Sequence, residues 1–282
     1  MDIKSIKNKI SLWAGLCVLV TSLSIALYST VFMRGKILDA ARNENISLAQ
    51  AIVSAVETRL NGVFTASGTM AQTFSAVKNK GVLLDCDRAM VLSIIRNELE
   101  NNSNIAGVFT CWEPNAFDGK DNDFVNKAGH DETGRFGVYL QRNNKGDVAL
   151  SSIFTDPVLA PNGKPGKWYN VPRETLKGFV TEPFLKNMQG EKVLVTTMVS
   201  PIIAHGEFFG VMAMQMKLNG LQQIADIVEK KQQAVKVKIS VISHDGILAG
   251  VTGAPELVGR HLKELHEDYE EDLATLKKLG RL

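Results

Sequence analysis

Two neighbouring runs decide the fold of this chain: residues 192–203, KVLVTTMVSPII, and residues 207–217, EFFGVMAMQMK. The first is rich in Val, Thr and Ile, and the second contains two Phe, one Val and three Met. Val, Thr, Ile and Phe are residue types that favour strands. His205 and Gly206 stand between them, and a short connection containing Gly is typical of a β-hairpin. The sequence therefore predicts two long antiparallel strands here.

Further strand-like runs lie on both sides of this hairpin. They are residues 105–112, residues 135–142 and 146–154 around Asn143-Asn144-Lys145-Gly146, and residues 234–243 and 247–251 around His244-Asp245-Gly246. The last four runs form two more predicted hairpins, because their connections carry turn residues. Residues 113–134 and 155–187 are predicted to be irregular, the second because it holds most of the chain's prolines.

Helical periodicity dominates the rest of the chain. Residues 34–80 contain no Pro, their apolar residues recur three or four apart, and Gly81 is a typical helix end. Shorter helices are expected at residues 86–101, 218–231 and 261–279. Helices followed by an antiparallel meander predict an α+β fold.

The N-terminal region has the properties of a membrane anchor. Residues 11–33 carry no charged side chain, and as a helix they would extend roughly 35 Å, enough to cross a hydrocarbon core of about 30 Å. A cleaved signal peptide is the alternative, but its apolar region is shorter, and residues 28–33 offer a poor cleavage site. Lysines before the span favour a cytoplasmic N-terminus and an exported C-terminal portion.

Charge and motifs narrow the function. The net charge is +2, and the surplus lies in the lysines before the span, which leaves no basic field for nucleic acid. The five histidines are scattered, and no zinc, phosphate-loop, dinucleotide or Gly-x-Ser-x-Gly motif is present. We expect a binding protein that is not an enzyme, with no metal and no cofactor. Cys86 and Cys111 could pair or be two partly buried thiols.

Two features of the irregular stretches are candidates for binding. Residues 118–123 are acidic, but they lack the ligand alternation of a calcium loop, so a solvated turn is favoured over a cation site. Trp168 and Tyr169 are adjacent and follow Lys167; their rings, polar tips and cation would suit a small organic ligand. The alternative is that the two rings pin a long loop to the sheet.

An ordered series of short motifs resembles a known family. After the anchor and the long helix come Trp112-Glu113-Pro114-Asn115, Gly134-Arg135-Phe136, Trp168-Tyr169-Asn170-Val171-Pro172, Glu182-Pro183-Phe184, Ser200-Pro201-Ile202 and Phe209-Gly210-Val211. This order resembles the exported sensor part of methyl-accepting chemotaxis proteins with double Cache domains. The resemblance implies a long helix shared by two stacked PAS-like modules, with a ligand bound in the membrane-distal one.

The resemblance also implies site residues. Trp168 and Tyr169 match the family's ligand-facing pair, Phe184 and Gln215 would face the same cavity, and Tyr139 and Trp112 are further candidates. Members that bind amino acids have an Arg two residues before the pair and an Asp two residues after it. In this sequence those two positions are Gly166 and Val171, and Gln215 stands where such members have a second Asp in the last strand. Lys167 is a partial substitute for the missing Arg cation. A small organic metabolite other than a free α-amino acid is therefore expected.

The expected organisation has three parts. Residues 1–33 are a cytoplasmic stub and transmembrane anchor, residues 34–232 the long helix and membrane-distal Cache module, and residues 233–282 an incomplete membrane-proximal module, as in a sensor truncated before its second span. We expect a single-pass inner-membrane protein that forms a homodimer through the long helix. The output could be that of a chemoreceptor, a histidine kinase or a diguanylate cyclase; an anchored exported enzyme or structural protein is the remaining alternative.

Overall fold

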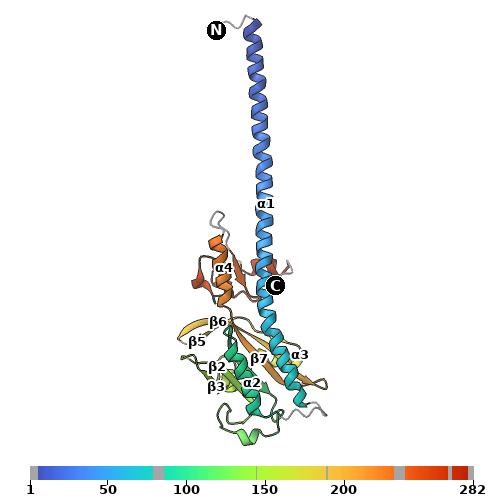
Figure 1. The fold of residues 1–282 in the computed structure, drawn as a ribbon, viewed down its shortest axis with the longest axis vertical. Coiled ribbons are helices and arrows are strands. Elements are labelled where there is room, and N and C mark those ends of the chain that lie inside the picture. Colours follow the sequence, from blue (N-terminus) through green and yellow to red (C-terminus); the bar gives the residue numbers. More distant parts are fainter. Residues whose placement is uncertain are drawn as a thin grey trace. The chain divides into compact units, whose positions relative to one another are not determined.

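The computed structural model describes residues 6–78, 86–143, 145–188, 190–231, 239–265 and 269–278. The helices are α1 (Ile6–Ser75), α2 (Arg88–Asn101), α3 (Lys167–Thr175), α4 (Asn219–Lys231) and α5 (Tyr269–Lys278). The strands are β1 (Ile105–Trp112), β2 (Gly137–Arg142), β3 (Val148–Ser152), β4 (Phe179–Val180), β5 (Phe184–Met188), β6 (Glu191–Ala204), β7 (Glu207–Lys217), β8 (Ser240–Ile242) and β9 (Leu248–Val251) (Figure 1). The α+β class expected from the sequence is confirmed.

A seven-stranded antiparallel sheet forms the centre of the fold. Its order is β3-β2-β1-β7-β6-β4, and β5 also pairs with β6. The predicted long hairpin is confirmed as β6 and β7, and the turn between them places His205 and Gly206 at positive φ. Because side chains alternate along a strand, β1, β2, β6 and β7 each contribute to two different cores.

One face of the sheet packs against α2 and the part of α1 after residue 55. The buried residues of this core are Val63, Ala71, Phe74, Val91, Ile95, Leu99, Ile105, Val108, Trp112, Phe117, Phe136, Val138, Leu140, Met198, Ile202, Met212, Met214 and Met216. The helical period explains which α1 residues take part, since Val63, Ser67, Ala71 and Phe74 recur three or four apart. Within this core, the Ser67 and Ser200 hydroxyls hydrogen-bond at 2.8 Å.

The opposite face, which we call the α3 face, packs against α3 and the segment that precedes it. Its buried residues are Phe109, Cys111, Tyr139, Ile153, Leu159, Trp168, Tyr169, Val199, Val211 and Ala213. Burial raises the pKa of the Cys111 thiol to about 12, so this cysteine is a protonated core residue at neutral pH.

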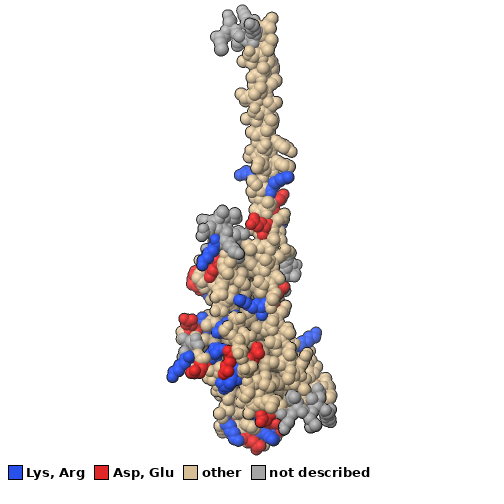
Figure 2. All heavy atoms as spheres, viewed as in Figure 1, with Lys and Arg blue, Asp and Glu red and all other residues tan. Residues whose placement is uncertain are grey.

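The chain divides into two compact units, Met1–Ala55 and Val56–Leu282, and α1 contributes to both. In the first unit, α1 carries an uncharged column of exposed apolar side chains over residues 11–33 (Figure 2). Among the described residues, α1 is the one helix whose length and apolar composition would allow it to cross a membrane.

A smaller pair of strands, β8 and β9, packs against α4. The side-chain amide of Gln222 accepts from the Val251 N–H at 2.8 Å and donates to the Val251 carbonyl at 2.9 Å, which fixes β9 to the helix. The pairing of β8 with β9 confirms the third predicted hairpin. Within the described residues its first strand begins only at Ser240.

Three sequence expectations are corrected. Residues 155–187 are not one irregular stretch, because they contain α3, β4 and β5; Pro172 is accommodated inside α3. The last helix does not begin at His261, which instead caps a short 3₁₀ turn by accepting from the Lys263 N–H. The long helix ends at Ser75 and a 3₁₀ turn follows it; Gly81, the expected stop, lies outside the described residues.

Candidate functional site

A polar cluster lies in the otherwise apolar α3 face. Tyr139 of β2 and Gln215 of β7 are both fully buried, although β1 separates their strands. The Tyr139 hydroxyl donates a hydrogen bond to Gln215 Oε1 at 2.5 Å. The structure therefore brings together two residues that the sequence analysis names as candidates.

Lys186 of β5 completes this contact. Its ammonium donates to the Tyr139 hydroxyl and to Gln215 Oε1, the latter at 3.2 Å, and it lies 4.3 Å from the centre of the Tyr139 ring. The Lys186 side chain is 11% exposed. A lysine buried to this extent is unusual, because desolvation disfavours the charged form.

The charge of Lys186 is only loosely compensated. Burial lowers the pKa of Lys186 to about 8, while attraction to Asp156 acts in the opposite direction. The Asp156 carboxylate lies 3.8 Å from the ammonium through Oδ2. Its Oδ1 accepts from the backbone N–H groups of Val158 and Leu159, so this acid is held mainly by its own loop.

Two buried donors of the cluster are unused by the described residues. Gln215 Nε2 and the hydroxyl of Thr197 have no hydrogen-bond partner there, although both residues are 0% exposed. Thr197 of β6 is the direct strand partner of Gln215, which makes the two groups neighbours. We call Tyr139, Lys186, Thr197 and Gln215 the Lys186 cluster. Buried polar groups without partners are rare and often mark functional sites.

Aromatic rings form a wall beside the cluster. The Phe109 ring contacts Tyr139 edge to face at 5.8 Å and Trp168 at 5.0 Å between centroids. Trp168 is 4% exposed, and its indole N–H donates to the Leu159 carbonyl at 2.6 Å. The wall therefore presents ring surfaces, and the hydrogen bond to Leu159 holds the Trp168 ring in one orientation.

Tyr169 lies beside a different cation. Its hydroxyl accepts from the Arg135 guanidinium at 2.6 Å, and the guanidinium stacks 5.2 Å from the Tyr169 ring centre. Arg135 also donates to the Trp112 carbonyl, which ties α3 to the end of β1. Tyr169 is thus buried in the same core as Trp168 and faces a separate polar contact.

The remaining candidates from the sequence lie in three different places. Phe184 is half-buried and packs on the α3 face, two residues before Lys186 on β5. Lys167 is exposed at the first turn of α3. Trp112 is buried in the core on the opposite face of the sheet, where its ring packs against Phe117.

Sequence reasoning missed Lys186, Thr197 and Phe109. The available signal was the position of Lys186 two residues after Phe184, since alternate residues of a strand share a face. That signal was hidden because residues 155–187 were expected to be irregular.

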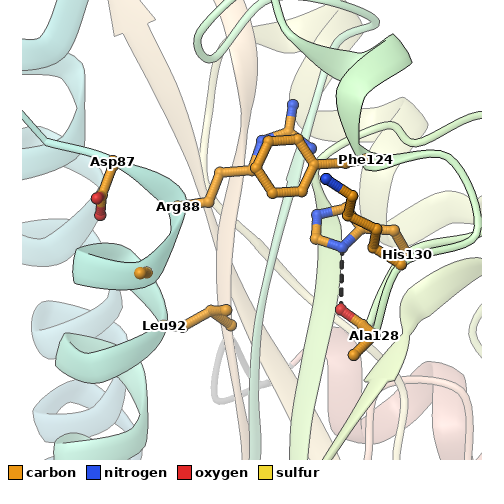
Figure 3. Close-up of a pocket in the computed structure, with 8 residues that line it drawn as sticks. Asp87, Arg88, Leu92, Phe124, Ala128 and His130 are labelled. Atoms are coloured by element: carbon orange, nitrogen blue, oxygen red, sulfur yellow. Dashed lines mark hydrogen bonds between the residues drawn. The ribbon is translucent and has the colours of Figure 1, made fainter.

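A surface hollow of about 490 Å³ lies elsewhere, beside the start of α2 and residues 124–130 (Figure 3). In that view Arg88 extends from α2 toward Phe124 and His130, and His130 Nδ1 contacts the Ala128 carbonyl. The Arg88 guanidinium is already committed, because it pairs with Asp118 and Asp121 and donates to the Gly134 carbonyl. We assign this hollow a structural role.

We call Arg88 together with Asp118, Asp121 and the Gly134 carbonyl the Arg88 clamp. It involves two acids of the run at residues 118–123. Asp118 and Asp121 lie 2.8 and 2.6 Å from the guanidinium, and Asp121 is 5% exposed. The expected solvated turn is therefore wrong for Asp121, which belongs to a buried ion-pair network. In the part of the chain that the structure describes, no group of acidic, His and Cys side chains is arranged to hold a metal ion.

Comparison with known proteins shows which family and fold this chain is similar to. Residues 91–223 match the family described as methyl-accepting chemotaxis protein-like, first PDC sensor domain. The methyl-accepting chemotaxis protein TlpQ of Pseudomonas aeruginosa is 26% identical over 194 residues, which are 66% of this chain and 27% of TlpQ. The chain thus spans about a quarter of that relative.

Solved structures share the fold. The extracellular domain of the histidine kinase mmHK1S-Z2 superposes with a TM-score of 0.66 at 22% identity, covering 84% of this chain and 83% of that one. The ligand-binding domain of the Pseudomonas aeruginosa chemoreceptor PctC, solved with GABA, has a TM-score of 0.52 at 17% identity, covering 80% and 81%. Residues 91–223 are therefore similar, by the family match and by the shared fold, to the first PDC sensor domain of methyl-accepting chemotaxis proteins.

Proposed function

We propose that this chain is the ligand-sensing part of a membrane-anchored chemoreceptor and that it binds a small organic metabolite on the α3 face. The Lys186 cluster carries the proposal. It places a buried lysine and two donors that have no partner among the described residues in the core of the domain, next to an aromatic wall. Perturbed ionisable groups and polar groups converging in an apolar setting are characteristic of binding sites.

Within this site each side chain has a physical role. Trp168 and Phe109 supply ring surfaces, Phe184 closes the β5 edge, and Tyr139 and Gln215 orient polar groups of the ligand. The function is recognition without turnover, consistent with a family of sensor domains. The family match favours a chemoreceptor over a histidine kinase, since the kinase structures share only the fold at this identity.

The anchor and the dimer belong to the same proposal. The apolar column of α1 over residues 11–33 would cross the inner membrane once, and the residues after it would be exported. Exposed Ile46 and Val53 of α1 are spaced one heptad apart, which supports contact with a second copy of the chain.

The chain offers its own reporter for a test. It has three tryptophans, and only Trp168 adjoins the Lys186 cluster: Trp112 lies on the other face, and Trp13 lies in the apolar column. The full chain in lipid nanodiscs would be labelled with fluorotryptophan, assigned with Trp→Phe variants and titrated with a metabolite library by fluorine NMR.

A saturable shift of the Trp168 resonance, with the Trp13 and Trp112 resonances unmoved, is the expected result. A library that binds but moves only the Trp112 or Trp13 resonance would place the site elsewhere. A library that leaves all three resonances in place and produces no thermal stabilisation would overturn the proposed function.

A further inference from the structure

The hydrogen-bonding groups of the Lys186 cluster are unbalanced. Gln215 Oε1 is occupied by two donors, the Tyr139 hydroxyl and the Lys186 ammonium. Gln215 Nε2 keeps two N–H donors, and the Thr197 hydroxyl keeps one, with no partner among the described residues. Within the described part of the chain, the Gln215 amide N–H groups and the Thr197 hydroxyl therefore have no acceptor.

The charge of the site also favours a group that accepts hydrogen bonds. Lys186 is the cation within the cluster, and Asp156 is 3.8 Å away with its other oxygen held by two backbone N–H groups. A buried ammonium with one acid at the outer limit of ion-pair distance, beside neutral donors, favours an incoming anion.

We propose that the α3 face binds a small monocarboxylate, whose oxygens accept from Lys186 Nζ, Gln215 Nε2 and the Thr197 hydroxyl. This inference rests on the proposed function and names the chemical class of its ligand. A carboxylate offers about four acceptor positions, enough for these donors. The body of the ligand packs against Phe109 and Trp168, whose rings favour a planar or short apolar group.

An amine does not fit the same groups. An ammonium donates and cannot accept, so it would need the Gln215 carbonyl, which Tyr139 and Lys186 already occupy. It would also place a second positive charge beside Lys186. The lowered pKa of Lys186 supports the choice of an anion, because a carboxylate at this position would restore the charged form of the lysine.

Matched probes separate charge from shape. Benzoate, benzamide and benzylamine share a ring, and butyrate, butyramide and butylamine share a chain, while their charges are negative, neutral and positive. Each would be titrated into the full fluorotryptophan-labelled chain in nanodiscs. We expect benzoate or butyrate to shift the Trp168 resonance at a concentration at least about tenfold lower than its amide or amine.

Two substitutions test the assignment of the donors. Lys186→Met should weaken carboxylate binding at least about tenfold, and Gln215→Glu should do the same because it replaces the amide donors with a like charge. Lys177→Met is the matched control, since Lys177 is an exposed lysine after α3. Thermal melts of each variant establish that the chain is folded.

The outcomes distinguish this inference from the function on which it rests. Tighter binding of an amide or an amine, with the Trp168 resonance shifted, overturns the monocarboxylate and leaves the sensor function intact. Carboxylate binding that survives in folded Lys186→Met but is lost in Lys167→Met moves the anion to the exposed lysine and also overturns the assignment. If no probe and no member of the metabolite library shifts any of the three tryptophan resonances or stabilises the chain, both proposals fail.

Discussion

Tyr139 reaches Gln215 by lying across Gly107. A Cβ at position 107 would be 2.6 Å from the Tyr139 ring, and the ring carries the hydroxyl that donates to Gln215 at 2.5 Å. Gly107 occupies the strand between the two residues, opposite Gln215 on one side and Gln141 on the other. The glycine is therefore required by close approach, and the contact across three strands depends on it.

Gly107→Ala should consequently displace the Tyr139 ring. We expect a loss of about 1–3 kcal/mol in the free energy of unfolding, as for other overpacked cores, together with weaker ligand binding. Gly62→Ala is the matched control: nothing lies within 4 Å of its Cβ position on α1, and alanine should stabilise the helix by about 0.5–1 kcal/mol. Denaturant melts measure both effects. A Gly107→Ala chain as stable as the wild type would show that the ring can move aside without cost.

Lys186 should lower the stability of the unliganded protein. Replacing a poorly compensated buried charge with an apolar side chain of similar length is often stabilising, and for Lys186→Met we expect a gain of about 1–3 kcal/mol near neutral pH. Asp156 tolerates the change because two backbone N–H groups hold its carboxylate. A variant less stable than the wild type would mean that the lysine contributes net attraction.

The pH dependence of stability has a defined sign. The pKa of Lys186 is lowered to about 8 in the folded protein from 10.5, so between these values the unfolded chain binds more protons and stability rises with pH. Above pH 10 the raised pKa of Tyr139 acts in the opposite direction, because the unfolded phenol ionises first. Lys78 and Lys217 also have lowered pKa values, so the measurement compares wild type with Lys186→Met. The difference between the two should shrink from pH 8 to pH 10, and a constant difference would contradict this.

The parts of the fold that follow from the sequence are those where pattern and environment agree. β1 and β7 have the predicted bounds, because their β-branched, aromatic and Met residues are buried on both faces. The β6–β7 turn was predictable from His205-Gly206.

β5 could not be predicted, for a physical reason. Leu185 is 44% exposed, whereas the Lys186 side chain is 11% exposed, which reverses the usual order of an alternating strand. The register of β5 with β6, in which Lys186 lies opposite Val193, sets which side chains of β5 point to the α3 face. Tertiary pairing thus overrides local composition at the position that places the lysine in the site.

The Arg88 clamp should be a separate source of stability. Arg88 is 2% exposed and holds Asp118, Asp121 and the Gly134 carbonyl together, so Arg88→Met leaves two acids near one another without their cation. Breaking a buried network in this way costs about 3–5 kcal/mol. Arg96→Met is the control, since its pair with Glu100 is exposed on both sides and contributes at most about 1 kcal/mol.

Denaturant unfolding measures the difference between Arg88→Met and Arg96→Met. Under native conditions ligand binding should persist in Arg88→Met, because the clamp lies outside the α3 face. Equal stability losses in the two variants would show that the buried network contributes no more than the surface pair.

The proposed homodimer predicts a periodic crosslinking pattern along α1. Ile46 and Val53 are 41% and 42% exposed, although both are large and apolar, and a heptad separates them. Glu44 and Ala51 are also exposed but lie on the opposite side of the helix, roughly 200° away at 100° per residue.

Single cysteines at the four positions would be oxidised in membranes, in a chain with Cys17 and Cys86 replaced by serine. Ile46→Cys and Val53→Cys should crosslink between chains several-fold faster than Glu44→Cys and Ala51→Cys, because only the first pair faces a partner helix. All four positions are exposed, so a difference in rate reports the interface and not access of the oxidant. Equal rates at the four positions, or none, would argue that α1 does not pair the chains through this face.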